Sequence, residues 1–280
     1  MTRRNRPPTV AQQTLSRRTW LEWVGKSTVF SLGAGVLARC TMDATGQPDA
    51  AGDAATGDAH IWPDGTGPEA GVDAAVPPVC DANPANFPFV PVDDNAELFQ
   101  PWQGWNVRTV DSQDLGWILN NWELTVDGLV TNPVTLSFAQ LLGLPRRDQV
   151  TDFHCVEGWS VYDVPWNGVH LSEVLALVGP DLAATHVTFH TVGDQYNESL
   201  PLDIALEPRT LLGYGINCHT MPLNHGFPLR VVIPRLLGYK NAKYVYRIEL
   251  TNEPIDGFWV NLGYSYDGEV PASRLREGKY

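Results

Sequence analysis

The stretch DFHCVEGWS at residues 152–160 decides how this 280-residue chain is interpreted. Its first half ends an alternation of apolar and polar residues over Gln149–Cys155, which predicts a β-strand. Its second half contains Gly158 and Trp159 and predicts a loop, so Cys155 stands where a strand ends. A thiolate in that position suits a soft metal ion, although a free cysteine is more commonly a buried, inert residue.

The segments around this stretch predict a strand-rich α+β domain with a few short helices. Ser137 predicts the N-cap of a short helix over residues 138–142. Leu171–Val178 predicts a second helix, because its apolar residues share one face, with Ser172 or an upstream polar residue as its cap. Asp127 and Gly128 predict a turn between strands. The other predicted strands are Trp122–Asp127, Leu129–Leu136, His186–Val192, Leu211–Asn217, Leu229–Ile233 and Lys243–Thr251.

Two further blocks accompany the first one, HGFPLRVVIP at 225–234 and KNAKYV at 240–245, the latter leading to GFW at 257–259. With CVEGWS at 155–160, they resemble the sulfite-oxidase-fold molybdopterin-binding oxidoreductases. The likeness runs from Trp105 to Pro271 and is greatest to the single-domain, sulfite-oxidase-like branch, related to the catalytic subunits of periplasmic protein-methionine-sulfoxide reductases. The resemblance implies a sulfite-oxidase fold, a molybdenum–molybdopterin cofactor, and Cys155 as the metal ligand and catalytic residue.

The resemblance also implies a set of cofactor-binding residues. Arginine and lysine suit the phosphate of the pterin, since both donate charge-assisted hydrogen bonds. Taken singly, Arg230 and Lys243 could equally be surface charges on strands, and His225 a structural histidine. The implied cofactor-binding residues are Asn106, Arg108, Cys155, Thr191, His225, Arg230, Asn241, Ala242 and Lys243.

The reaction that we expect is oxygen-atom transfer, with an S-oxide or N-oxide as the substrate. Val156, Glu157, Gly158 and Trp159 follow Cys155, where sulfite oxidases place arginine, and an acid there disfavours the sulfite dianion. The sequence has no haem-attachment CxxCH motif. We therefore expect electrons to pass through a separate partner, such as a membrane haem protein.

Two alternatives come from other functional classes. The first is a zinc hydrolase that uses His154, Cys155, Cys218 and His219, although neighbours on one strand point to opposite faces and do not ligate together easily. The second is a non-catalytic exported binding protein with the same fold. Metal content distinguishes the two alternatives from a molybdenum enzyme.

The N-terminal segment predicts export. SRRTWL at residues 16–21 precedes an apolar run at 27–38, as in a twin-arginine signal, and residues 1–40 carry six Arg and one Lys against one Glu. The apolar run is shorter than the roughly 20 residues of a membrane span. LARC at 37–40 resembles a lipobox, except for Arg39, so Cys40 is a candidate lipid anchor. The expected location is the periplasm or cell envelope.

The composition divides the rest of the chain into two parts. Residues 41–86 are rich in Ala, Asp, Gly and Pro and predict a disordered linker, while residues 87–280 predict the folded oxidoreductase domain. A net charge of −13 argues against a nucleic-acid partner, because binding phosphate needs clustered Lys and Arg. The four cysteines form no CxxC pair and indicate no disulfide framework, but they leave open one disulfide, for example involving Cys80.

Overall fold

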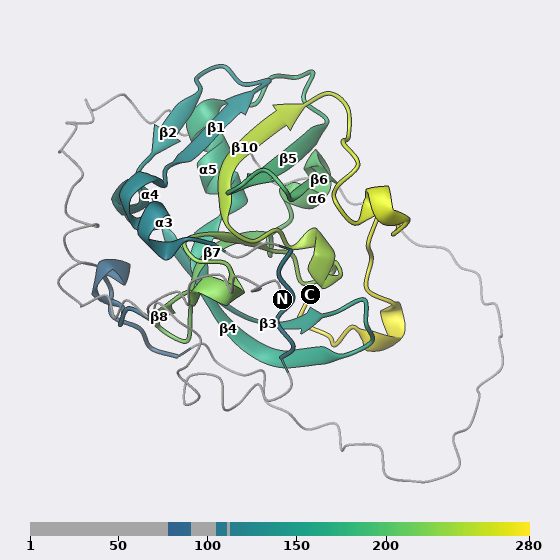
Figure 1. The fold of residues 1–280 in the computed structure, drawn as a ribbon, viewed down its shortest axis with the longest axis horizontal. Helices are drawn as coiled ribbons and strands as arrows, with labels where there is room; N and C mark the ends of the chain where they lie inside the picture. Colours follow the sequence, from purple (N-terminus) through teal and green to yellow (C-terminus); the bar gives the residue numbers. More distant parts are fainter. Residues whose placement is uncertain (1–77, 91–104, 111–112) are drawn as a thin grey trace, which may run out of the picture. The chain divides into compact units, whose positions relative to one another are not determined.

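The computed structural model describes residues 78–90, 105–110 and 113–280, which form two β-sheets with short helices packed against them (Figure 1). The first sheet has the strand order β2-β1-β10-β5-β6. Its strands are β1 (Leu124–Gly128), β2 (Val134–Leu136), β5 (His186–Thr191), β6 (Asn197–Pro201) and β10 (Val245–Thr251). β1 pairs in parallel with β10, and the other neighbours are antiparallel.

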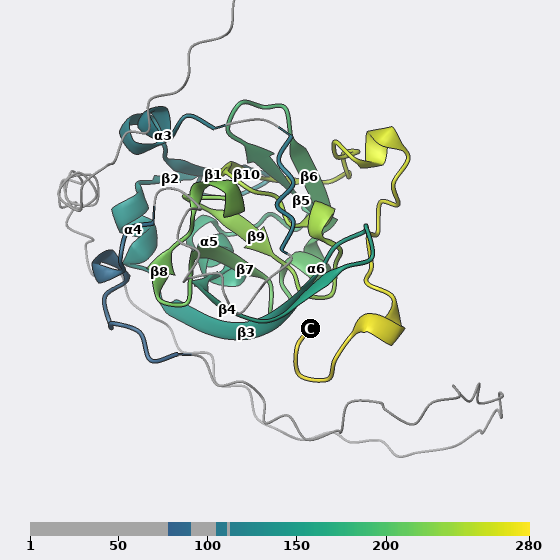
Figure 2. The same cartoon turned by 60° about the horizontal axis from the view of Figure 1, so that its bottom comes forward.

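The second sheet is antiparallel and has the order β3-β4-β7-β8, with β9 also paired to β7. Its strands are β3 (Arg146–His154), β4 (Ser160–His170), β7 (Leu211–Ile216), β8 (His219–Thr220) and β9 (Arg230–Val232). β3 and β4 form the long curved hairpin at the lower edge of Figure 2, and the turn at its tip carries Cys155.

The helices are short. They are α3 (Leu115–Asn121), α4 (Phe138–Leu142), α5 (Leu171–Val178) and α6 (Leu202–Ala205), with 3₁₀ turns η1 (Pro84–Asn86), η3 (Leu223–His225), η4 (Gly238–Lys240), η5 (Val260–Leu262) and η6 (Ala272–Arg274). No helix in the described part of the chain has the length and apolar character needed to cross a membrane. The expected strand-rich α+β class is confirmed.

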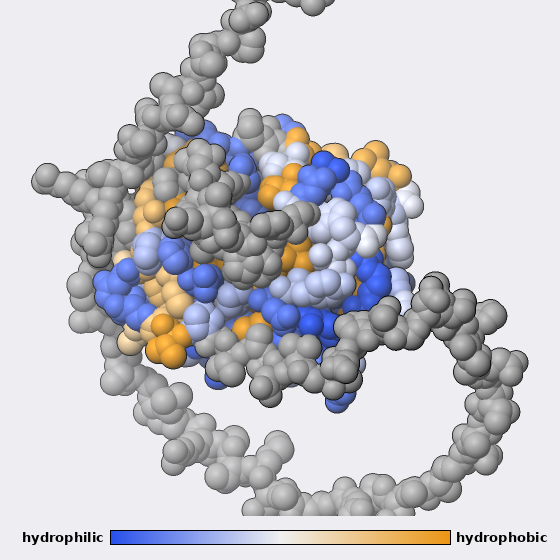
Figure 3. Space-filling model, turned by 90° about the horizontal axis from the view of Figure 1, so that it is seen from below, coloured by the Kyte–Doolittle hydropathy of each residue, from blue (hydrophilic) through white to orange (hydrophobic). Residues whose placement is uncertain are grey.

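The core is apolar and continuous between the sheets. α5 buries Leu171, Val174, Leu175 and Val178, each of which stabilises the fold by roughly 1.5–3 kcal/mol on full burial. The largest fully buried side chains include Trp166, Phe189 and Phe227. On the face shown in Figure 3, hydrophobic and hydrophilic residues are mixed over the described surface.

Both predicted helices are present with their predicted lengths. Ser137 caps α4 in a reciprocal capping box with Gln140. The predicted polar cap of α5 is wrong: this helix begins after His170, whose side chain makes no capping hydrogen bond, and Ser172 lies inside it. Burial of its apolar face, rather than a cap, therefore holds α5.

The predicted strand Leu129–Leu136 is shorter in the structure, where β2 begins only at Val134. Gly128 ends β1 at φ 86°, and a Cβ atom there would lie 2.2 Å from the carbonyl oxygen of Leu250, so this position requires glycine. After it, the amide of Thr131 bonds to the carbonyl of Gly179 instead of continuing the sheet.

A disulfide joins Cys80 to Cys218 and corrects the predicted linker boundary. Pro84, in η1, is buried, and the guanidinium of Arg146 donates to the carbonyl of Asp81. Residues 78–86 therefore belong to the folded domain and not to a disordered linker. The predicted signal segment, Cys40 and the remainder of the predicted linker lie outside the described residues.

Candidate active site

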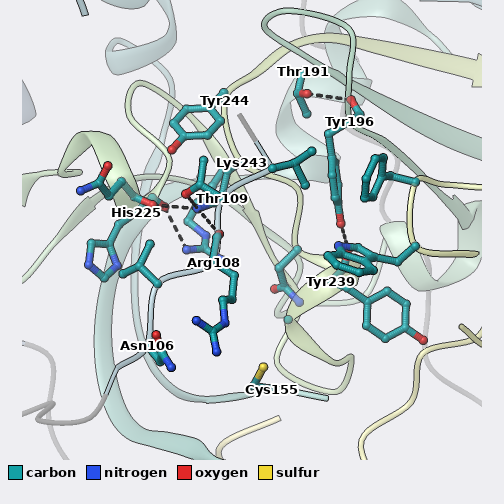
Figure 4. Close-up of a pocket in the computed structure, with 18 of the residues that line it drawn as sticks. Asn106, Arg108, Thr109, Cys155, Thr191, Tyr196, His225, Tyr239, Lys243 and Tyr244 are labelled. Carbon is teal, nitrogen blue, oxygen red and sulfur yellow. Dashed lines mark hydrogen bonds between the residues drawn. The ribbon is translucent and has the colours of Figure 1, made fainter. Parts of the chain in front are cut away.

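A cavity of about 490 Å³ opens where five parts of the chain converge: the segment 105–110, the turn after β3, the loop between β5 and β6, the loops around η3 and η4, and the C-terminal segment 258–264. Figure 4 shows the labelled groups, with the Cys155 sulfur below the others. Eight predicted site residues line the cavity, namely Asn106, Arg108, Cys155, Thr191, His225, Arg230, Asn241 and Lys243. Ala242 does not line it, because its side chain is 1% exposed and packs in the core.

Cys155 is the free cysteine of the described residues, and it is half-buried. Its turn is closed by two backbone hydrogen bonds, from the Cys155 amide to the Trp159 carbonyl at 2.9 Å and from the Gly158 amide to the Cys155 carbonyl at 3.1 Å. Gly158 has φ 97°, which the tight turn requires. Burial raises the pKa of the Cys155 thiol.

Glu157 lies beside this thiol and is held on two sides. The indole Nε1 of Trp159 donates to its Oε2 at 2.9 Å, and the Nη2 of Arg108 lies 3.0 Å from its Oε1. The Cys155 sulfur is 3.9 Å from the same Oε2. The hydrogen bonds from Trp159 and Arg108 lower the pKa of Glu157, so this carboxylate carries its charge close to the thiol.

Arg230 and His225 form the buried side of the cavity. Arg230 is buried, its guanidinium lies 5.3 and 5.2 Å from the ring centres of Phe153 and Trp166, and it donates to the carbonyl of His225 at 2.9 Å. Burial lowers the pKa of Arg230 to about 10, which leaves it charged at neutral pH. Burial, followed by the charges of Arg230 and Lys243, lowers the pKa of His225 to about 3, so this imidazole is neutral.

Three of the predicted polar residues hold loops at the cavity wall. The ammonium of Lys243 donates to the carbonyl oxygens of Arg108 and Asn224 and to the hydroxyl of Thr109, at 2.6 to 2.8 Å. The side-chain oxygen of Asn241 accepts from the backbone amide of Ile233 at 2.6 Å. Its side-chain nitrogen donates to the backbone carbonyls of Leu236 and Leu237, before η4. The hydroxyl of Thr191 donates to the carbonyl of Tyr196 at 2.7 Å.

The opposite wall is aromatic. Tyr196 stacks on Phe258 at 5.8 Å, Trp259 contacts Tyr264 edge-on at 5.2 Å, and Tyr264 contacts Tyr239 at 5.5 Å. The hydroxyl of Tyr196 donates to the carbonyl of Tyr239, which fixes these two residues to each other (Figure 4). The three tyrosines were not among the predicted site residues, because single tyrosines in separate segments carry no pattern that distinguishes them.

The donor set fits a phosphorylated pterin that carries a soft metal. The cavity lining has three cationic side chains against one carboxylate, although the whole chain has a net charge of −13. A thiol sulfur accompanies these cations, and thiolate is a ligand that soft metals prefer. The residues therefore match both parts of such a cofactor.

Comparison with known proteins agrees with this chemistry. Residues 99–259 match the model of the family described as oxidoreductase molybdopterin binding domain. The chain belongs to this family. This oxidoreductase molybdopterin-binding domain includes every lining residue of the cavity except Tyr264. The prediction of a molybdopterin-dependent oxidoreductase is confirmed, and molybdenum with molybdopterin is its cofactor.

Relatives within the molybdopterin-binding family include several reductases. An uncharacterized oxidoreductase of Bacillus subtilis is 38% identical, over 54% of this chain and 76% of that protein. Protein-methionine-sulfoxide reductase catalytic subunits of Gluconobacter oxydans and Campylobacter jejuni are 37% and 32% identical, over 50% and 53% of this chain. The chain spans about half the length of these two subunits, 50% and 55%.

A solved structure of the sulfane dehydrogenase SoxCD from Paracoccus pantotrophus is also similar. It is 21% identical, with a TM-score of 0.45, and the match covers 49% of this chain and 39% of that one.

The zinc alternative is not supported. Cys218, one of its four ligands, is joined to Cys80 in a disulfide. His154 bonds to the hydroxyl of Ser160 through Nδ1, and His219 contacts the carbonyl of Asn217 in the same way. Within the described ranges, no three His, Cys, Asp or Glu side chains are grouped to hold a metal ion. Because the chain belongs to an oxidoreductase family, the alternative of a non-catalytic binding protein is not supported either.

Proposed function

We propose that this oxidoreductase is an exported enzyme that reduces an S-oxide or N-oxide by oxygen-atom transfer, with Cys155 as the metal ligand. The observation that carries this proposal is the half-buried thiol of Cys155 in the wall of a cavity lined by Arg108, Arg230 and Lys243. When bound, the cofactor supplies a metal centre that exchanges an oxygen atom and two electrons.

Cys155 contributes the soft ligand, which must lose its proton to bind the metal. Because burial raises the pKa of this thiol, the residue keeps its proton until a metal displaces it. The turn 155–159 holds the sulfur at the cavity, and the adjacent Glu157 is anchored by Trp159 and Arg108 instead of bonding the thiol tightly.

The pterin side is assigned to the predicted polar residues. Arg230 and Arg108 present guanidinium groups for the phosphate, and Asn106 and the neutral His225 present hydrogen-bonding groups. Lys243 adds a fixed positive charge, and its hydrogen bonds attach the segment 105–110 to the loop at Asn224. Thr191 and Asn241 shape the wall by holding loops, and Ala242 serves through its carbonyl, which accepts from the amide of Val231.

The substrate is an uncharged oxide. A carboxylate at Glu157 repels a dianion such as sulfite, since like charges at short range are unfavourable. The aromatic wall of Tyr196, Phe258, Trp259 and Tyr264 suits a sulfur compound, because sulfur makes favourable contacts with aromatic rings. Two relatives are named protein-methionine-sulfoxide reductase catalytic subunits, which makes methionine sulfoxide the first substrate to test.

The proposal also specifies the compartment of the protein and the source of its electrons. The twin-arginine segment at 16–21 would carry the protein to the periplasm or cell envelope already folded, with its cofactor inserted. The Cys80–Cys218 disulfide supports an oxidising compartment. Cys40 would tether the chain as a lipoprotein. Electrons would come from a separate membrane haem protein, in keeping with relatives that are named as subunits.

The test begins with the full chain purified after native export. One molybdenum and one pterin per chain, with reduction of methionine sulfoxide by an artificial electron donor, would support the proposal. Cys155→Ala should abolish turnover while Thr125→Ala, on β1 and outside the cavity lining, keeps it. A fully active Cys155→Ala enzyme, or faster turnover of sulfite than of any sulfoxide or N-oxide, would overturn it.

A further inference from the structure

The C-terminal segment 269–280 lies outside the part of the chain that the family model matches, yet it contacts the turn that carries Cys155. Figures 1 and 2 both show the C-terminus beside β3. We propose that Arg274 in this segment is a positioning residue that holds the turn of Cys155 in the form that binds the metal. This inference rests on the proposed role of Cys155.

Arg274 clamps both ends of the turn with one guanidinium group. Its Nη1 donates to the Cys155 carbonyl at 3.1 Å, and its Nη2 donates to the Trp159 carbonyl at 2.7 Å and to the Ser160 hydroxyl at 2.9 Å. The Ser160 hydroxyl also bonds to Nδ1 of His154 at 2.8 Å. The clamp therefore reaches the last residue of β3, the first residue of β4 and the cysteine between them.

The turn has few other restraints. Val156, Glu157 and Gly158 are exposed, so the middle of the turn contributes little packing, and Trp159 is its one residue packed against the core. Its two closing hydrogen bonds already use the Cys155 and Trp159 carbonyls, and Arg274 adds a second donor to each of them. Charge-assisted bonds from a planar group with two separated nitrogens fix direction as well as distance. Arg274 thus determines how the Cys155 backbone, and with it the sulfur, is oriented.

Arg274 is itself anchored on both sides along the chain. On its C-terminal side, Arg276 pairs with the buried Asp152 at 2.5 Å and with Asp163 at 3.0 Å, and Lys279 pairs with Asp163 at 2.6 Å. On its N-terminal side, the amide of Val270 bonds to the carbonyl of Arg235 at 2.9 Å. These anchors join the segment to both strands of the β3–β4 hairpin, so Arg274 is held in place before any cofactor binds.

The experiment uses the full chain prepared without cofactor and measures the rate at which Cys155 is alkylated. Mass spectrometry of the Cys155 peptide keeps Cys40 out of the measurement. Arg274→Ala should raise this rate by about tenfold, because the turn then opens more often. Arg274→Lys should give an intermediate rate, since one ammonium cannot replace the planar donors. Arg235→Ala is the matched control, because Arg235 pairs with Glu269 in the same segment but does not touch the turn.

Arg274→Gln and Ser160→Ala provide the same test if Arg274→Ala fails to fold, since each removes only part of the clamp. A second readout is the electron paramagnetic resonance spectrum of the cofactor-loaded enzyme, which should shift in the Arg274 variants and not in Arg235→Ala. An alkylation rate within twofold of the wild type in every Arg274 and Ser160 variant, or an equal rise in Arg235→Ala, would overturn the inference. The alkylation result is independent of the metal, so it separates failure of this inference from failure of the proposed function.

Discussion

The Nζ atom of Lys240 lies 2.5 Å from the Oε1 atom of Glu198, and neither side chain is more than 1% exposed. This pair joins β6 to η4, beside the aromatic wall of the cavity. Lys240 also donates to the carbonyl of Ser199 at 3.0 Å and lies 4.5 Å from the ring centre of Tyr266. Two charges are thus buried together behind the site.

Breaking this pair on one side should be costly, because the remaining charge is left buried without its counter-ion. We expect Glu198→Gln to lower the free energy of unfolding by about 3–5 kcal/mol. The double change Glu198→Leu with Lys240→Met should restore most of that loss. Urea denaturation of the two variants measures the difference. Asp127→Asn, which breaks a half-buried pair with Arg247, is the control and should cost less, about 1 kcal/mol.

The buried His225 predicts a loss of stability in acid. Its pKa is near 6.5 in the unfolded chain and about 3 in the folded protein, so the unfolded state binds the proton more readily. The contribution of His225 to the free energy of unfolding is fully present above about pH 6.5. As the pH decreases from about 6.5 toward 3, this contribution falls by up to about 1.4 kcal/mol per pH unit. Urea midpoints of the wild type and of His225→Gln, compared across this window, test the prediction. Parallel curves would contradict it.

The disulfide should contribute strongly to stability, because Cys80 and Cys218 are separated by 138 residues. Closing so long a loop restricts the unfolded chain, so Cys218→Ser should reduce the free energy of unfolding by about 2–5 kcal/mol. Reductant should lower the unfolding midpoint of the wild type but leave that of Cys218→Ser unchanged. Cys155→Ser, whose cysteine is unbridged, should keep the response to reductant.

Glu157 should determine whether the enzyme prefers neutral or anionic substrates. Replacing it as Glu157→Gln removes the carboxylate near Cys155 and frees the guanidinium of Arg108, and both effects favour an anion. We expect the KM for a sulfoxide that carries a carboxylate to fall by about tenfold, while the KM for dimethyl sulfoxide changes little. Steady-state kinetics with an artificial donor measures both. An equal change in the two KM values would contradict the prediction, because the charge of Glu157 would then not discriminate between the two substrates.

The sequence could predict the elements whose formation depends on residues close to one another in the chain. The capping box at Ser137 and the apolar face of α5 are determined within a few residues, and both helices are found where they were expected. β4 was missed because it is buried on both faces over residues 164–169 and contains Pro165 and Gly168, so it shows no alternation.

The residues of the candidate site also fall into those that the sequence could predict and those that it could not. The motif around Cys155 and the block at 225–234 could be found because their residues are consecutive. The tyrosines of the aromatic wall reach the cavity from separate segments, and Arg274 reaches the Cys155 turn from the C-terminal segment, so only the folded chain brings them together. Their side chains could not be assigned from the sequence because nothing near them in the chain indicates a partner.

The order of strands in the first sheet has a consequence for how the protein is made. β10 lies in the middle of this sheet, between β1 and β5, and it is the last of its strands to be synthesised. While the ribosome is still translating the chain, β1 and β2 form a hairpin that has no central neighbour, and β5 and β6 form another. The sheet can close only after residue 251 has emerged, so folding is completed late, on the whole chain. Until then the nascent protein exposes two strand edges whose backbone N–H and C=O groups are unpaired, which makes this stage the one at which a chaperone is most needed.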